Sequence, residues 1–256
     1  MSDELKQSRQ VIQEISPRDG MQNKSNPEYY FVWGSQGLET IERLAALVDL
    51  SAVKTVLDFP SGHGRVLRYL RAAYPDAVIT ACDLDRDAVD FCAQTFGARP
   101  IYSTADLATV QLDGVYDLIW CGSLLTHVHA DQWRDLLGLF SEHLSDSGLL
   151  VFTTHGRCFA NRLHSGQTNL GLSDWAVTAI LSDYDQFGFG FQKYSGQEAY
   201  GISLSSSSWV CSQIVRTSGL RLAGYQEGAR RPGQTSAGGW GGMQDAVACV
   251  SSRRDI

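Results

Sequence analysis

The sequence predicts an α/β fold, in which a parallel sheet is covered by helices on both faces. From Thr55 to Phe152, short apolar runs alternate with segments whose apolar residues recur every three or four positions. The apolar runs are continuous, which is typical of strands that are buried on both sides. One such run leads directly into a glycine-bearing turn, a helix and a second strand, so the unit is expected to be built around a ligand.

The chain before this region predicts an arm and a helix. Residues 1–27 are polar and contain Pro17, Gly20 and Pro27, so we expect a flexible N-terminal arm. An aromatic cluster follows at residues 29–34. After it, apolar residues at helical spacing predict a helix: Leu38, Ile41, Leu44, Ala45 and Val48. Residues 28–256 are expected to form one domain with an insertion at 155–206.

The strand at residues 56–59 ends in a turn that carries two glycines. Gly62 and Gly64 lie in this turn, and a helix pattern follows over 66–73. The next strand, 77–82, ends at Asp83. Glycines without a Cβ let the backbone approach a ligand, and an acid at the tip of the second strand can accept both ribose hydroxyls. This arrangement favours an adenosine-containing cofactor.

The spacing of the glycines argues against a dinucleotide. The dinucleotide fingerprint needs a third glycine, and Leu67 occupies that position. An acid (Asp58), three residues and then Gly62-His63-Gly64 resemble motif I of the class I S-adenosylmethionine-dependent methyltransferases. The resemblance extends over about residues 35–155.

Further segments resemble this family in the same order. Asp83 matches its ribose-binding acid, and Ala105-Asp106, after a short strand at 99–102, matches the pair that borders the adenine. Residues 116–127 resemble the fourth strand with its following loop, and residues 144–152 resemble the turn into the fifth strand. In one departure, Pro60 stands where the family usually has glycine. We interpret the turn as a stiffer variant, since proline fixes φ and removes a donor.

The resemblance implies a Rossmann-like sheet of seven strands with the last strand antiparallel, and S-adenosylmethionine as cofactor. It also implies a set of cofactor-binding residues. These are Asp58, Pro60, Gly62, Gly64, Arg65, Asp83, Leu84, Ala105, Asp106, Cys121 and Gly122. The aromatic cluster at 29–34 has two open interpretations: it covers the methionine end of the cofactor, or it covers the sheet edge.

The remaining elements follow from apolar spacing. Helices are predicted over 87–96, 131–144 and 207–218, and strands over 220–225 and 246–250. The insertion at 155–206 is rich in Gly, Ser, Tyr and Phe and is too long for an ordinary loop. In the family such an insertion shapes the acceptor pocket. Gly188 and Gly190 would let this insertion move as a lid over the acceptor pocket.

Candidate catalytic residues must lie where the strands end. His127 follows the fourth strand and His155 follows the fifth, so either could serve as a general base. His63 lies in the cofactor turn and is interpreted as shaping its backbone or contacting the cofactor, rather than as a base. His127 and His129 form only a weak metal pattern, and we predict no metal site.

Three aromatic residues are candidates for the acceptor site. Tyr194 and Tyr200 belong to the insertion, where rings and hydroxyls suit a small organic molecule. Trp240 lies in a glycine-rich turn before the last strand. With Gln244 and Asp245 beside it, Trp240 would either form an exposed wall of the acceptor site or pack down on the sheet from a flexible hairpin.

Composition limits the partners. The chain has 256 residues, a formal net charge of −7 and no extended basic cluster, which disfavours nucleic acid. The polar N-terminus predicts no secretory signal, and no run is long enough to span a membrane. The six cysteines show no paired spacing, which fits a reducing cytoplasm.

The sequence therefore predicts a cytoplasmic S-adenosylmethionine-dependent methyltransferase that acts on oxygen or nitrogen of a small molecule. Two alternatives stay open: a non-catalytic protein that binds the same cofactor, and a nicotinamide-dependent enzyme. Methylation of a protein is a third possibility, although residues 121–124 lack the acceptor signature of such enzymes.

Overall fold

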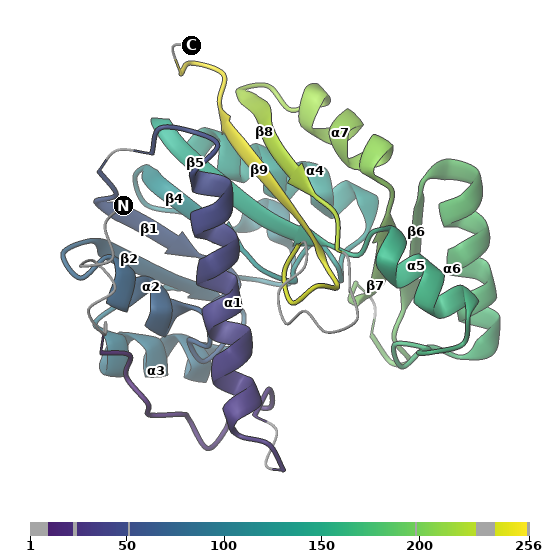
Figure 1. Cartoon of the computed structure of the whole chain (residues 1–256), viewed down its shortest axis with the longest axis horizontal. Coiled ribbons are helices and arrows are strands. Elements are labelled where there is room, and N and C mark those ends of the chain that lie inside the picture. Colours follow the sequence, from purple (N-terminus) through teal and green to yellow (C-terminus); the bar gives the residue numbers. More distant parts are fainter. Residues whose placement is uncertain (1–9, 23–24, 51, 198, 229–238, 255–256) are drawn as a thin grey trace.

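A seven-stranded sheet forms the centre of the molecule (Figure 1). The computed structural model describes residues 10–22, 25–50, 52–197, 199–228 and 239–254. The strands are β1 (Thr55–Asp58), β2 (Val78–Asp83), β3 (Arg99–Tyr102), β4 (Tyr116–Cys121), β5 (Leu144–Thr154), β8 (Leu220–Gln226) and β9 (Asp245–Ser251). Their order is β3-β2-β1-β4-β5-β9-β8, and β9 runs antiparallel to the other six strands of this sheet. The predicted sheet, with its last strand antiparallel, is confirmed.

Helices cover both faces of this sheet (Figure 1). One face carries α1 (Glu28–Ala45), α2 (Leu67–Ala73) and α3 (Arg86–Phe96), and the other carries α4 (Ala130–His143) and α7 (Ser207–Arg216). An apolar core lies on each face of the sheet, and successive residues of a strand belong alternately to the two cores. Val56 packs with α1 and α2, and Leu57 packs with α4. Because both positions are buried, the strands appear in the sequence as continuous apolar runs.

Helix α1 begins earlier than the apolar spacing predicts. It starts at Glu28, directly after Pro27, and includes the aromatic cluster. Gly34 lies inside the helix, where a Cβ would come within 2.2 Å of the Arg65 carbonyl oxygen. A glycine that we placed before the helix is therefore a contact point, which lets α1 lie close to the turn after β1.

Residues 10–22, part of the segment predicted as a flexible arm, contact the domain surface. The buried Arg68 of α2 donates from Nη1 to the Ile12 carbonyl oxygen at 2.9 Å and from Nε to the Gly64 carbonyl oxygen at 3.1 Å. The Tyr30 hydroxyl donates to Asp19 at 2.7 Å. One arginine thus connects this segment to the turn that carries the glycines.

The insertion forms a cap beside the ends of β4 and β5. It contains α5 (Arg157–His164), α6 (Asp174–Phe187), β6 (Phe189–Lys193) and β7 (Gly201–Ser205), with a small apolar core of its own. Strand β7 is tied to the sheet by backbone bonds from Gly201 N to His127 O at 3.0 Å and from Ser205 N to His155 O at 2.9 Å. The cap therefore lies on the two segments that carry the candidate catalytic histidines.

The two glycines of the cap have packing roles in this structure. Gly188 ends α6 in the left-handed conformation, with φ 76°. Gly190 lies in β6, where a Cβ would come within 2.2 Å of the Ile180 carbonyl oxygen. One therefore terminates a helix and the other permits tight helix–strand packing, and movement of the cap at these residues stays a prediction.

Candidate active site

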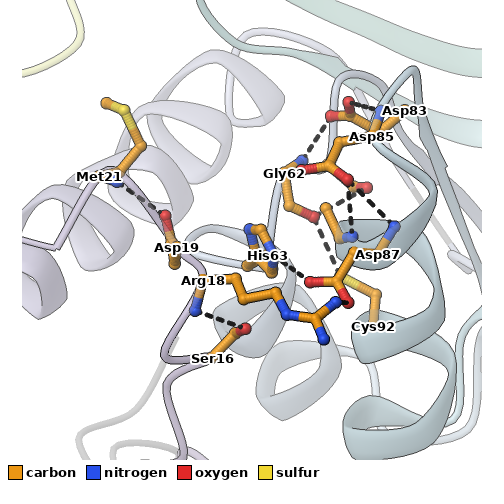
Figure 2. Close-up of polar contacts among 12 residues, drawn as sticks. Ser16, Arg18, Asp19, Met21, Gly62, His63, Asp83, Asp85, Asp87 and Cys92 are labelled. Atoms are coloured by element: carbon orange, nitrogen blue, oxygen red, sulfur yellow. Dashed lines mark hydrogen bonds and ion pairs between the residues drawn. The ribbon is translucent and has the colours of Figure 1, made fainter.

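The turn after β1 is held to β2 through its backbone. The Gly62 amide donates to Asp83 Oδ2 at 2.7 Å, and the Ser61 amide donates to the Cys82 carbonyl oxygen at 3.0 Å. Asp83 also accepts from the Asp85 amide at 2.9 Å. The acid at the tip of β2 therefore shapes the turn directly, as Figure 2 shows. Burial raises the pKa of Asp83, while these backbone donors act in the opposite direction.

The two glycines of the turn have different roles. Gly62 has φ 48°, and a Cβ built there meets nothing within 4 Å. Gly64 has φ 78°, and a Cβ there would lie 2.4 Å from the Phe96 ring. The expectation that both glycines make room for a ligand is wrong for Gly64, which makes room for α3. Only Gly62 borders open space.

Asp58 is a buried carboxylate without a partner. Its side chain is 1% exposed, and neither oxygen has a hydrogen bond to the described residues. Burial and the nearby Asp83 raise the pKa of Asp58 well above its ordinary value, and Arg65 lowers it. Burying a charge without a partner is costly, so such a group points to a missing cation.

Arg65 is the positive charge that lowers the pKa of this acid. Its guanidinium lies 5.6 Å from the centroid of the Trp240 ring. Burial lowers the pKa of Arg65, and the charges of Tyr30, Asp19 and Asp58 oppose this effect. A buried carboxyl group and a guanidinium thus lie beside the same turn.

His63 and the N-terminal segment meet on the other side of the turn. His63 Nε2 lies 3.2 Å from Asp87 Oδ2, and Arg18 also contacts the Asp87 carboxylate (Figure 2). His63 is 7% exposed. Its ring therefore stabilises the turn against α3, in agreement with our interpretation of it as a residue that shapes the turn.

The remaining predicted cofactor residues lie along the same edge of the sheet. Leu84 is 58% exposed after β2, and the exposed Ala105 and Asp106 follow β3. Cys121 ends β4 and is buried, and Gly122 follows it. A Cβ at Gly122 would come within 2.8 Å of the Trp120 ring, so this position needs glycine. Pro60 lies in the turn after β1 and is half-buried.

His127 is held in one tautomer. Its Nδ1 lies 2.7 Å from the Gly201 carbonyl oxygen, which can only accept, so Nδ1 carries the proton. The ring stacks on Tyr200, with centroids 4.7 Å apart and planes inclined by 17°. Burial lowers the pKa of His127. The imidazole is therefore neutral near pH 7, and its Nε2 lone pair is available to accept a proton.

His155 lies beside His127 but in a different environment. The two ring centroids are 6.1 Å apart. His155 is 4% exposed, packs on Phe159, and its Nδ1 has no partner among the described residues. Burial, and then the charge of His127, lowers its pKa to about 3. His155 is therefore neutral at any ordinary pH.

The two tyrosines and Trp240 are placed differently from one another. Tyr194 and Tyr200 are near His127, with the Tyr194 and His127 centroids 6.3 Å apart. Trp240 is 2% exposed, packs edge-on against Trp120 and donates from Nε1 to the Trp33 carbonyl oxygen at 3.1 Å. The exposed wall predicted for Trp240 is therefore wrong: the ring packs between α1 and the sheet, the other arrangement that we considered.

A cavity of about 960 Å³ lies between the cap and the start of α4. It is lined by the start of α6, the start of α4 and the end of β6, including Trp175, Phe191 and Tyr194. None of its lining residues belongs to the cofactor turn, so this cavity is not the cofactor site. Tyr194 connects it to the aromatic cluster around His127.

Three residues hold the loop after β4 in a way that the sequence did not predict. Ser123, Thr153 and Gln244 form a closed set of hydrogen bonds, although they come from three distant parts of the chain. A positive φ of 62° at Ser123 is not visible in a sequence. Gln244 was predicted only as a neighbour of Trp240 in a wall of the acceptor site.

The described residues were also searched for a metal site and for a membrane-spanning helix. Within them, no group of three or more His, Cys, Asp or Glu side chains is arranged to hold a metal ion. In the same part of the chain, no helix has the length and apolar character needed to cross a membrane.

Comparison with known proteins agrees with this architecture. Residues 57–150 match a family model described as a methyltransferase domain. A malonyl-[acyl-carrier protein] O-methyltransferase of Anoxybacillus flavithermus is 27% identical over 113 residues, which are 44% of this chain and 43% of that protein. Its counterpart from Acetivibrio thermocellus is 25% identical over 54% of this chain and 50% of that protein. The chain thus matches only about half the length of these curated relatives.

Solved structures share the fold over most of their length. An S-adenosylmethionine-dependent methyltransferase from Clostridium acetobutylicum has a TM-score of 0.54 and 14% identity, with 86% of this chain and 91% of that chain covered. DesVI of Streptomyces venezuelae has a TM-score of 0.55 and 13% identity, with 85% and 91% covered. The glycopeptide N-methyltransferase MtfA, solved with S-adenosylmethionine, has a TM-score of 0.52 and 13% identity, with 85% and 93% covered.

The sheet order, the glycine-bearing turn and the acid at the tip of β2 define a Rossmann-like protein that binds an adenosine-containing cofactor. Residues 57–150 thus form a methyltransferase domain. The chain has the fold of the class I S-adenosylmethionine-dependent methyltransferases, with S-adenosylmethionine as the cofactor.

Proposed function

We propose that this enzyme transfers the methyl group of S-adenosylmethionine to an oxygen of a small acceptor, with His127 as general base. The geometry of His127 carries the proposal. Its Nδ1–H is fixed on the Gly201 carbonyl, its pKa is lowered by burial, and it lies where β4 ends. A hydroxyl acceptor needs such a base, because a neutral hydroxyl is a poor nucleophile.

The residues around the turn fit the cofactor. Asp58 offers a buried carboxylate for an ammonium group, and Arg65 offers a guanidinium for a carboxylate. Gly62 leaves open space, and Asp83 lies at the tip of β2, where a ribose is expected. Leu84, Ala105, Asp106, Cys121 and Gly122 would border the adenine, and Pro60 and Gly64 would fix the shape of the turn.

The cofactor supplies an electrophilic methyl on a sulfonium, whose neutral thioether is a good leaving group. The protein therefore needs to align the acceptor and take up one proton. As the acceptor oxygen forms its bond to carbon, the hydroxyl proton passes to His127 Nε2. The Gly201 carbonyl stabilises the imidazolium that forms, because it accepts the hydrogen bond from Nδ1. Alignment supplies much of the rate.

His155 would act on His127 rather than on the acceptor. It is buried and neutral, and its ring is 6.1 Å from His127. In this arrangement it excludes water from one side of the base. We propose that His127 is the base and that His155 fixes its surroundings.

Tyr200 and Tyr194 would contact the acceptor. Tyr200 stacks on the base, and Tyr194 borders both the base and the cavity on the cap. An acceptor whose reacting hydroxyl meets His127 could place a flat apolar portion against these rings. The exposed Trp175 at the cavity would extend the same surface.

The first experiment measures S-adenosylhomocysteine formation with 1-naphthol, a flat hydroxyl-bearing probe. His127→Gln should lower kcat by roughly 10²–10⁴-fold, the usual contribution of a general base, with cofactor affinity unchanged. His143→Gln is the matched control, because His143 also bonds a backbone carbonyl through Nδ1 but lies at the far end of α4. Full turnover in His127→Gln would refute the role of the base.

The curated relatives favour a second candidate, methylation of a carboxylate on a carrier-bound acid. A carboxylate is already ionised near pH 7, so this reaction needs no base. The two candidates therefore separate on malonyl-acyl-carrier protein: turnover that survives His127→Gln indicates a carboxylate acceptor. A chain that binds S-adenosylhomocysteine and turns over neither probe favours the non-catalytic alternative.

A further inference from the structure

Gln244 lies at the centre of a closed hydrogen-bonded ring near the proposed base. Its Oε1 accepts from the Thr153 hydroxyl at 2.6 Å, and its Nε2 donates to Ser123 Oγ at 2.8 Å. The Ser123 amide completes the ring by donating to Thr153 Oγ1 at 2.8 Å. Since Gln244 uses both ends of its amide, neither an acid nor an apolar side chain can replace it in full.

The hydrogen-bonded ring holds Ser123 in a backbone conformation that is unfavourable for serine. Ser123 has φ 62°, in the left-handed region that favours glycine. Such residues persist only where their surroundings hold them, and they gather at functional sites. Here the amide and the side chain of Ser123 are both held by the ring.

This conformation directs the loop that leads to the base. The Ser123 carbonyl oxygen accepts from the Thr126 hydroxyl at 2.7 Å, and the His127 amide donates to the Leu124 carbonyl oxygen at 2.9 Å. The residue before Ser123 is Gly122, which is proposed to border the cofactor. Ser123 therefore stands between the cofactor edge and the base, on one short loop.

Gln244 connects the ring to the C-terminal part of the chain. Gln244 is bridged to Trp240 through its backbone, and Asp245 begins β9. Thr153 lies in β5 beside this strand. The ring thus joins β5, β9 and the loop after β4 at one point.

We infer that Gln244 is a positioning residue, which holds Ser123 in its left-handed conformation and so sets the place of His127 relative to the cofactor. The inference rests on the proposed function of His127. Gln244 itself acts through Ser123, and the assignment requires no contact between Gln244 and cofactor or acceptor.

The test compares Gln244→Met, Ser123→Gly and the double variant, with Gln213→Met on α7 as the matched control. The probes are S-adenosylhomocysteine affinity by calorimetry, the His127 imidazole resonances by NMR, and the melting temperature. Gln244→Met should weaken S-adenosylhomocysteine binding roughly tenfold, because the loop that carries Gly122 and Ser123 is then no longer held in place before the cofactor binds. It should also shift the His127 resonances, whereas Gln213→Met should leave the affinity and these resonances unchanged. The melting temperature reports how much overall stability each variant loses.

Glycine at position 123 should restore part of the loss. Because glycine adopts a positive φ without strain, the double variant should bind S-adenosylhomocysteine more tightly than Gln244→Met alone. Unchanged affinity and unchanged His127 resonances in Gln244→Met would overturn the inference. So would a loss that Ser123→Gly does not reduce, because Gln244 would then act by another route.

The proposed function fails separately from this inference. If the wild-type chain does not bind S-adenosylhomocysteine, the cofactor assignment is refuted. In that case, a comparison of the His127 resonances between Gln244→Met and the wild type still decides whether the hydrogen-bonded ring holds the loop after β4.

Discussion

Replacing Asp58 by Asn should have opposite effects on the free protein and on its complex with cofactor. In the free protein the carboxylate is 1% exposed and has no hydrogen-bonding partner among the described residues. Removing its charge removes an unpaired buried ion, so the melting temperature of the ligand-free protein should rise. In the complex the same change removes a charge-assisted hydrogen bond to the ammonium group of the cofactor.

The size of the binding loss follows from that bond. A hydrogen bond to a charged partner contributes about 1.5–3 kcal/mol, which corresponds to a loss of roughly 10- to 150-fold in affinity. Calorimetry with S-adenosylhomocysteine measures this directly. The matched ligand is 5′-methylthioadenosine, which has the adenosine and the sulfur but lacks the amino-acid end.

Only S-adenosylhomocysteine should lose affinity in Asp58→Asn, and methylthioadenosine should bind as it does to the wild type. An equal loss for both ligands would refute the reasoning, because it would place Asp58 near the adenosine or in a general structural role. Arg65→Met should show the same discrimination, since its guanidinium is proposed to hold the carboxylate of the same amino-acid end.

The gain in stability should depend on pH with a defined sign. Burial raises the pKa of Asp58 above its ordinary value of 3.8, so the folded state binds more protons than the unfolded state above that pH. The wild-type protein therefore loses stability as pH rises from 3.8 through the folded pKa. Asp58→Asn lacks this loss, and its advantage in melting temperature should be larger at pH 7 than at pH 4.

Four other substitutions have distinct expected outcomes. Gly64→Ala should lower the melting temperature strongly, because a Cβ at this position meets the Phe96 ring at 2.4 Å. Gly62→Ala should cost only about 1 kcal/mol of folding stability and should reduce cofactor affinity instead. The reverse ranking in a thermal melt would contradict our assignment of the two glycines. Asp83→Ala should weaken S-adenosylhomocysteine binding roughly tenfold to a hundredfold, because it removes charge-assisted hydrogen bonds to the ribose and leaves the Gly62 amide without its acceptor. An unchanged affinity in calorimetry would show that Asp83 does not belong to the cofactor site. Burial raises the pKa of Asp245 from 3.8 to about 6, so wild-type stability should fall by about 2 kcal/mol relative to Asp245→Asn as pH rises from 4 to 7. Parallel melting curves for the two proteins across this range would show that Asp245 does not titrate as described.

The elements that could be predicted depend on local pattern. The unit from β1 to β2 is contiguous in sequence, and its burial on both faces gives continuous apolar runs. The position of Asp83 follows from that unit alone. The start of α1 could not be placed, because Gly34 resembles a helix end in the sequence and is a packing contact in the fold.

The parts of the site that could not be predicted depend on distant contacts. Gly64 and Gly62 are indistinguishable in sequence, and only the neighbouring Phe96 separates their roles. The buried position of Trp240 depends on Trp33, far away in the chain. His127 was predicted as a candidate base from its place after a strand, while the carbonyl of Gly201 that orients it comes from the insertion.

The attachment of β7 determines how the cap can open. Its amides at Gly201, Ser203 and Ser205 donate to the backbone of His127, Thr126 and His155. A cap that swung away as a rigid body would break these bonds and release the base at the same time. Hydrogen exchange at the three amides should therefore match the slowest exchange of β4 and β5.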